Sequence, residues 1–202
     1  MKRIPFYLFG LSLLSLVACN NSSEEAEDKT AKSTGEEYKL NVETSQIRWF
    51  GEKIKNNEVV GSHNGTVKFI KGNLLFENKN IIGGAFEIDM NSISEESVVS
   101  KDATLKLVND LKSENFFETA KYPIAKVTIT GGNQETIKGV LKVRDMEMNF
   151  EAPISVQYLE NKIQSGIVFD LDFSPLRIAS LGGDGEFISP KIGLRIFMEL
   201  VK

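Results

Sequence analysis

The sequence predicts an all-β protein: an antiparallel β-barrel of about eight strands with one short helical insertion. From residue 38 onward, successive runs alternate apolar and polar side chains with a period of two, as half-buried strands do. Turn-forming residues separate these runs, and no strand–helix–strand rhythm of a parallel sheet is present. Because each strand has a single apolar face, the sheet must close on itself to bury it.

The N-terminal residues predict a signal peptide rather than a part of this fold. Two basic residues precede an apolar run over Ile4–Val17, which is too short to span a bilayer comfortably. The run ends in Leu-Val-Ala followed by Cys19, the only cysteine of the chain. This pattern is similar to a bacterial lipobox, in which the cysteine becomes lipidated after cleavage. We therefore expect a lipoprotein signal peptide at residues 1–18 and a lipidated Cys19.

Composition indicates how the rest of the chain is divided and which partners it can have. Residues 19–37 contain almost no large apolar side chain, so we expect a disordered acidic tether there. The globular domain then covers residues 38–202, which is long enough for one core. With 24 Lys and Arg against 28 Asp and Glu, we expect no nucleic-acid partner. The lipid anchor predicts a cell-envelope location, at the outer membrane on its periplasmic face or the cell surface; the oligomeric state stays open.

The first half of the domain predicts five strands. Turn chemistry at Lys71–Asn73 separates the third of them from the fourth. The predicted strands are Tyr38–Leu40, Gln46–Lys53, Asn64–Ile70, Leu74–Glu77 and Ile81–Met90. Their predicted apolar faces carry Ile47, Trp49, Gly65, Val67, Phe69, Ile82, Gly84, Phe86, Ile88 and Met90.

A change of period after these strands predicts the helical insertion. Ser92-Ile93-Ser94-Glu95 fits a capping box, so a helix is expected to begin there and to run towards Asp110. Its apolar stripe would hold Val98, Leu105, Val108 and Leu111. The stripe is narrow and is interrupted by Ser and Thr, which predicts one broken helix or two short ones.

The segment Leu111–Pro123 organises the rest of the chain. Phe116 and Phe117 are adjacent large rings in a stretch too polar for a strand core, and Tyr122-Pro123 fixes an extended exit. One interpretation is that the segment closes one end of the barrel, with its two rings plugging or lining the interior. The other is an ordinary connection whose rings only seal the core.

Strands resume after this segment. The clearest alternation in the chain is Met146–Tyr158, in which seven apolar residues face one way, and five polar residues and Pro153 face the other. Residues Arg177–Pro190 predict a loop. The predicted strands are Ile124–Thr130, Thr136–Val143, Met146–Tyr158, Lys162–Phe173 and Lys191–Leu200.

Several motifs together resemble the YceI-like family. They are Trp49–Gly51 with His63–Val67, Gly83–Ile93, Leu111–Phe117 with Lys121–Pro123, and Ile137–Leu141. The resemblance covers Tyr38–Lys202. Members are lipocalin-like periplasmic proteins associated with polyisoprenoid binding. The resemblance therefore implies a lipocalin-like barrel and a long apolar ligand, such as a quinone or a polyprenyl carrier.

The candidate ligand-binding residues are large apolar side chains on the predicted inner faces, together with the two adjacent rings. Burial of each methylene group of a ligand against such a wall contributes about 0.8 kcal/mol. The pattern alone does not distinguish a hollow barrel from a filled one, and the resemblance favours the hollow one. The candidates are Trp49, Phe69, Phe86, Phe116, Phe117, Met148, Phe150, Ile167, Phe169 and Ile196.

Two other functions stay open at this point. An envelope scaffold or protein-interaction module with a solid core would have the same sequence pattern. A hydrolase would have to use His63, the only histidine, which falls in a predicted turn at Ser62–Gly65. Asp170 and Asp172 lie on a predicted outer face. We therefore expect that the protein is not an enzyme and that it has no catalytic residue, no cofactor and no metal site.

Overall fold

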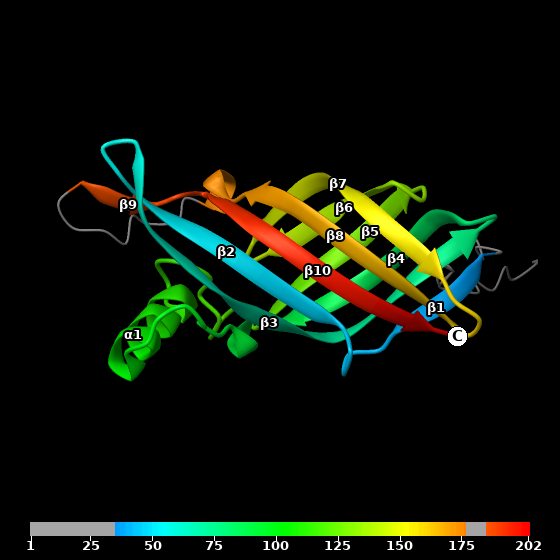
Figure 1. Cartoon of the computed structure of the whole chain (residues 1–202), viewed down its shortest axis with the longest axis horizontal. Helices are drawn as coiled ribbons and strands as arrows, with labels where there is room; N and C mark the ends of the chain where they lie inside the picture. Colours follow the sequence, from blue (N-terminus) through cyan, green and yellow to red (C-terminus); the bar gives the residue numbers. More distant parts are fainter. Residues whose placement is uncertain (1–34, 177–184) are drawn as a thin grey trace, which may run out of the picture. The chain divides into compact units, whose positions relative to one another are not determined.

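A closed antiparallel β-barrel of eight strands forms the body of the protein in a computed structural model, which describes residues 35–176 and 185–202 (Figure 1). Each strand pairs with the next one in the chain, and β10 pairs back onto β2 to close the ring. The predicted fold class is confirmed. The barrel strands are β2 (Gln46–Lys55), β3 (Glu58–Glu77), β4 (Asn80–Asp89), β5 (Ile124–Gly132), β6 (Thr136–Val143), β7 (Met146–Tyr158), β8 (Lys162–Asp172) and β10 (Lys191–Val201).

The predicted signal peptide, Cys19 and most of the predicted tether lie outside the described residues. So do residues 177–184 of the predicted loop. The described part starts two residues earlier in strand than the sequence predicts, because Glu36 and Glu37 already pair with Phe76 and Leu75 of β3. Main-chain pairing places these two exposed residues in the sheet, and an apolar pattern cannot reveal that.

The two ends of the barrel differ in what covers them (Figure 1). At one end, β1 (Glu36–Leu40) pairs with both β3 and β10. The opposite end carries β9 (Glu186–Ile188), which pairs with β2, and the helix α1 (Lys101–Lys112). Two short 3₁₀ turns, Met90–Ser92 and Ser174–Leu176, follow β4 and β8.

Two β-bulges make the strands in the first half of the domain differ from the predicted ones. β3 is one continuous strand of 20 residues, so the predicted turn at Lys71–Asn73 is wrong. The register shifts at Ile70, and a bulge bends a strand without ending it. A second shift in the pairing of β3 with β4 leaves Ile82 unpaired. Beyond that shift Ile81 faces inward and is 2% exposed, so the predicted inward face of Ile82 is also wrong.

The predicted helix start is wrong as well. Helix α1 begins at Lys101, and its N-cap residue Ser100 makes no side-chain cap hydrogen bond. The hydroxyl of Ser92 instead donates to the carbonyl oxygen of Asp89 and accepts from the backbone N–H of Lys68. These bonds hold Ser92 against β3, so the capping box does not form. Leu105, on the predicted apolar stripe, is 60% exposed, because the buried face of the short helix carries Leu111.

The barrel interior contains two hydrophobic clusters. The packed end, beside β1, is filled by side chains that leave almost no exposed surface; they are Leu40, Leu74, Phe76, Ile81, Ala152, Ile154, Ile163 and Leu200. Phe76 also makes edge-to-face ring contacts with Tyr38 and Tyr158, at centroid distances of 5.6 and 6.2 Å. The second cluster lies at the opposite end, beside α1 and β9, which we call the cavity end. It joins Met90, Leu111 and Phe116 to side chains from the halves of the barrel strands that lie nearest to this end.

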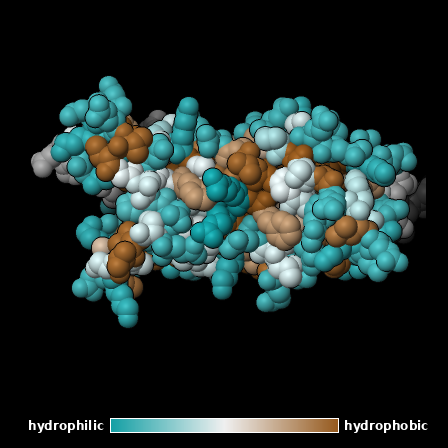
Figure 2. Space-filling model, viewed as in Figure 1, coloured by the Kyte–Doolittle hydropathy of each residue, from teal (hydrophilic) through white to brown (hydrophobic). Residues whose placement is uncertain are grey.

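The outer surface is mostly hydrophilic. In Figure 2, teal side chains cover most of the face, and brown patches show near the middle and at the end that carries α1 and β9. Exposed large apolar residues of that end include Val59 and Val60 of β3, Val99, Leu105 and Phe187. Among the described residues, no helix is long and apolar enough to cross a bilayer.

Candidate ligand-binding cavity

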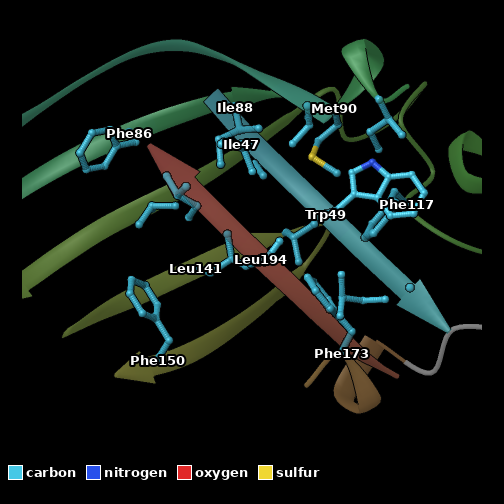
Figure 3. Close-up of a pocket in the computed structure, with 18 of the residues that line it drawn as sticks. Ile47, Trp49, Phe86, Ile88, Met90, Phe117, Leu141, Phe150, Phe173 and Leu194 are labelled. Atoms are coloured by element: carbon cyan, nitrogen blue, oxygen red, sulfur yellow. The ribbon is translucent and has the colours of Figure 1, made fainter. Parts of the chain in front are cut away.

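A cavity of about 180 Å³ occupies the cavity end of the barrel. All eight barrel strands contribute to its wall, and every lining side chain except that of His63 is apolar or aromatic, or is a glycine. Figure 3 shows Ile47 and Trp49 of β2, Ile88, Leu141, Phe150 and Leu194 pointing into one shared space, with Met90, Phe117 and Phe173 beside it. The floor is formed by side chains that also belong to the packed cluster; they are Phe86, Ile129, Ile137, Ile167 and Met198.

Aromatic rings are arranged in contacting groups around this space. Phe116 packs edge-on against Phe117, and Phe117 packs edge-on against Phe173, with centroid distances of 5.6 and 5.9 Å. Deeper in the barrel, Phe150 and Phe169 stack at 5.8 Å. Such ring pairs stabilise the wall beyond the area that they bury, by about 0.5–1.5 kcal/mol each.

The segment after α1 lies at the cavity end. The backbone N–H of Phe117 donates to the carbonyl oxygen of Leu111 at 3.1 Å, so the chain turns back on the helix. Arg144 donates from Nη1 to the carbonyl oxygen of Phe116 at 2.8 Å. Phe116 is 2% exposed, and both rings line the cavity. Of the two interpretations of this segment, the structure supports the one in which the rings line the interior.

Residues Ile93–Ser97 form a second cover. β4 pairs with β3 only from Lys68 onward, which leaves one edge of the earlier part of β3 free. The backbone N–H of Ser94 donates to the carbonyl oxygen of Thr66, and that of Glu96 donates to Asn64, at 2.9 and 2.8 Å. The indole Nε1 of Trp49 donates to the carbonyl oxygen of Ser94 at 3.1 Å. This approach requires glycine at position 65, because a methyl group there would overlap the Ser94 oxygen.

One polar pair, a partly exposed histidine and a buried glutamate, adjoins the apolar wall. His63 lies in β3 opposite Gly51 and lines the cavity, so the predicted turn at Ser62–Gly65 is wrong. Its Nδ1 lies 3.7 Å from Oε1 of Glu95, whose side chain is fully buried. Oε1 of Glu95 also accepts from the backbone N–H of Ser97 at 2.8 Å. Neither Nδ1 of His63 nor Oε2 of Glu95 has a hydrogen-bond partner.

Three basic residues near this end form ion pairs with carboxylates. Arg48 pairs with Glu96 at 2.7 Å, and both Lys53 and Lys55 pair with Glu186 of β9. The hydrogen bond from Lys53 holds the pKa of Glu186 below its usual value. In the part of the chain that the structure describes, no Lys or Arg lines the cavity.

Nine of the ten predicted binding residues line the cavity; they are Trp49, Phe69, Phe86, Phe116, Phe117, Phe150, Ile167, Phe169 and Ile196. Met148 does not line it, because its side chain packs within the cluster around Phe116 and Phe173 and is 7% exposed. Whether these residues bind a ligand stays a prediction. Three further lining residues, His63, Leu107 and Ile188, were not predicted from the sequence. The spacing of Leu107 and Leu111, four residues apart on α1, was the signal available for that face.

Asp172, on the predicted outer face of β8, has a structural role in a turn. Asp172 accepts hydrogen bonds from the hydroxyl and the backbone N–H of Ser174, which lower its pKa and hold the 3₁₀ turn after β8. Within residues 35–176 and 185–202, no three His, Cys, Asp or Glu side chains gather in a way that could hold a metal ion.

The YceI-like domain matches residues 38–200 of this sequence. The chain belongs to the YceI-like family. Solved structures show the same fold at low sequence identity. BcnA of Burkholderia cenocepacia superposes with a TM-score of 0.61 at 13% identity, covering 79% of this chain and 98% of BcnA. A polyisoprenoid-binding domain from Saccharophagus degradans superposes with a TM-score of 0.56 at 16% identity, covering 81% of this chain and 97% of that domain. The comparison with curated proteins gives no match.

Proposed function

We propose that this YceI-like protein is an envelope-anchored lipoprotein whose barrel binds a long apolar ligand of the polyisoprenoid type, for carriage or storage. The observation that carries the proposal is the apolar cavity, to which all eight barrel strands contribute. A barrel that served only as a scaffold has no need of such a space, because empty volume in a core lowers stability. The polyisoprenoid-binding domain with the same fold supports this ligand class.

The size of the cavity constrains how such a ligand sits. A dry apolar cavity of about 150 Å³ holds benzene, so about 180 Å³ holds roughly one or two isoprene units. A longer chain therefore requires lining side chains to change rotamer or part of the chain to leave the barrel. Phe150 and Phe169 line the cavity and are only partly buried, so we expect these two rings to be among the side chains that move.

The first test is the content of the purified protein. Solvent extraction followed by mass spectrometry should recover a long apolar molecule at near one-to-one stoichiometry. A protein that is always empty and also rejects added isoprenoids would contradict the proposal and favour the scaffold.

A matched pair of substitutions then separates a lined cavity from a filled core. Phe169→Asp places a charge in the cavity wall, so we expect loss of ligand with the fold retained, because the carboxylate can keep water in the hollow. Val168→Asp on the same strand is the control, since Val168 is 62% exposed and faces outward. Ligand content is read by mass spectrometry and folding by circular dichroism. Unfolding of Phe169→Asp alone would indicate solid packing at that position.

Anchoring is tested separately. Cys19→Ser should abolish incorporation of radiolabelled fatty acid in bacterial cells and move the protein from the membrane fraction to the soluble fraction. Labelling that persists in Cys19→Ser would overturn the lipoprotein part of the proposal and leave the binding part intact.

A further inference from the structure

Among the described residues of the cavity wall, His63 is the only titratable one, and the fully buried carboxyl group of Glu95 lies 3.7 Å from its Nδ1. Burial of a histidine in an otherwise apolar wall costs free energy of desolvation unless its ring nitrogens form hydrogen bonds with a polar partner. Glu95 supplies only part of such a partner, because its Oε1 lies 3.7 Å from Nδ1, beyond hydrogen-bond distance. Both Nδ1 and Oε2 are shielded from solvent and have no partner.

The geometry fixes which atom of His63 a ligand can meet. Nδ1 faces the carboxylate and is out of reach, whereas 29% of the His63 side chain is exposed, so Nε2 is the remaining polar atom. A carboxylate only accepts hydrogen bonds, so in the neutral ring the nitrogen that faces it carries the hydrogen. Nε2 is then an acceptor, and the group that suits it is a hydrogen-bond donor.

We propose that His63, oriented by Glu95, binds the head group of the ligand, and that this head group is a neutral hydroxyl at the end of an apolar chain. This inference rests on the proposed function and names the ligand class for the same site. A diphosphate is disfavoured, since no Lys or Arg of residues 35–176 and 185–202 lines the cavity and a carboxylate lies behind the ring. A carbonyl oxygen is disfavoured because it can only accept. The ligand thus lies with its hydroxyl beside β3 and its chain running towards Phe86 and Ile137.

Three probes with one common chain test this class. Farnesol, farnesyl methyl ether and farnesyl diphosphate share 15 chain carbons and differ only in the head group. Binding to the delipidated protein is followed by the fluorescence of Trp49, the only tryptophan, which lines the cavity. We expect farnesol to bind about tenfold more tightly than the methyl ether, because the ether leaves Nε2 without a donor. The diphosphate should bind most weakly.

Substitutions then assign the preference to the pair. His63→Phe keeps a ring and removes the nitrogens, so farnesol should lose its advantage while binding of the methyl ether stays unchanged. Glu95→Gln keeps an acceptor for the N–H of Ser97 and no longer fixes the ring hydrogen, so the advantage should shrink. This milder variant provides the answer if His63→Phe does not fold. Ser62→Ala, at the exposed neighbouring residue, is the control and should bind all three probes like the unchanged protein.

The outcomes separate the two proposals. Equal binding of farnesol and its methyl ether, or tightest binding of the diphosphate, would overturn the head-group inference while leaving an apolar carrier. A farnesol advantage that persists in both His63→Phe and Glu95→Gln would also overturn it. If none of the probes binds, the proposed function fails, and the head-group inference fails with it.

Discussion

The packed end and the cavity end of this barrel share the same strands and the same alternating pattern, but only one of them is filled. At the packed end, Leu74 and Leu200 have no exposed surface. At the cavity end, Leu194, on the same strand as Leu200, borders a hollow. Alternation therefore decides which side chains point inward, but it does not decide whether those side chains fill the barrel interior.

The covers of the two ends account for the difference. β1 adds main-chain pairs to β3 and β10 and brings Tyr38 and Leu40 onto the packed end, so the strands draw together over a continuous core. The cavity end is covered by pieces that are not barrel strands, namely Ile93–Ser97, the turn with Phe116 and Phe117, and β9. These pieces rest on the rim and leave the space beneath them open.

The largest expected effect comes from truncating equivalent leucines at the two ends. Leu200→Ala should lower the free energy of unfolding by about 3–5 kcal/mol, because it opens a cavity in a packed core. Leu194→Ala should lower it by only about 1–2 kcal/mol, since that side chain already borders a hollow. Urea denaturation of both variants measures the difference.

The same two variants should differ in the chains they accept. Leu194→Ala adds room to the cavity, so we expect its preferred ligand among C10, C15 and C20 prenols to shift to a longer one. Leu200→Ala should keep the preference of the unchanged protein, because the floor residues Ile137 and Ile167 separate it from the cavity. Equal losses of stability and equal chain preferences would break the distinction between the two ends.

The difference between the ends also limits what the sequence can predict. Period-two alternation placed Trp49, Phe86 and Phe150 correctly on the inner wall, because side-chain direction in a strand is a local property. Bulges at Ile70 and Ile82 were missed, because they are set by the register between β3 and β4 and not by the residues of one strand alone. Where a strand contains a bulge, the sequence predicts the strand but not which of its residues face the barrel interior.

The covers were harder to predict than the wall. Ser92–Glu95 matches a capping box by residue type, but the free edge of β3 offers Ser94 and Glu96 main-chain hydrogen bonds that the helix cannot. Pairing of β3 with β2 places His63 in a strand of the cavity wall instead of in the predicted turn. Tertiary contacts of this kind override local propensity, so the proposed head-group site could not be predicted from the sequence.

An intermediate effect is expected where a cover meets the wall. Gly65→Ala places a methyl group on the carbonyl oxygen of Ser94 and close to the ring of Trp49. We expect the Ile93–Ser97 segment to be displaced, with a loss of about 1–3 kcal/mol in unfolding free energy and altered Trp49 emission. Gly61→Ala on the same strand is the control, since its methyl group would meet only Cβ of Lys53 at 3.8 Å. If Gly65→Ala keeps both stability and emission, the cover is not held by this contact.

The smallest effect at neutral pH is expected at the packed end, where Glu199 ties the turn between β1 and β2 to β8. Its carboxylate accepts hydrogen bonds from Lys162 at 2.6 Å and from Gln164, Asn41 and Thr44 at 3.2–3.3 Å. The bond from Lys162 is the main reason why the pKa of Glu199 falls to about 2. Glu199→Gln keeps an acceptor of similar volume, so the neutral-pH loss of stability should be smaller than in the variants above.

The pH dependence identifies this contribution. A carboxyl group with a lowered pKa in the folded state stabilises the protein above its unfolded pKa of 4.5, and that stabilisation is lost as the pH falls through the folded value of about 2. The difference in unfolding free energy between the unchanged protein and Glu199→Gln should therefore be constant near neutral pH and shrink between about pH 4.5 and 2. Ligand affinity should not change, because Glu199 is not part of the cavity wall. A difference that stays constant down to pH 2 would show that the charge of Glu199 does not stabilise the packed end.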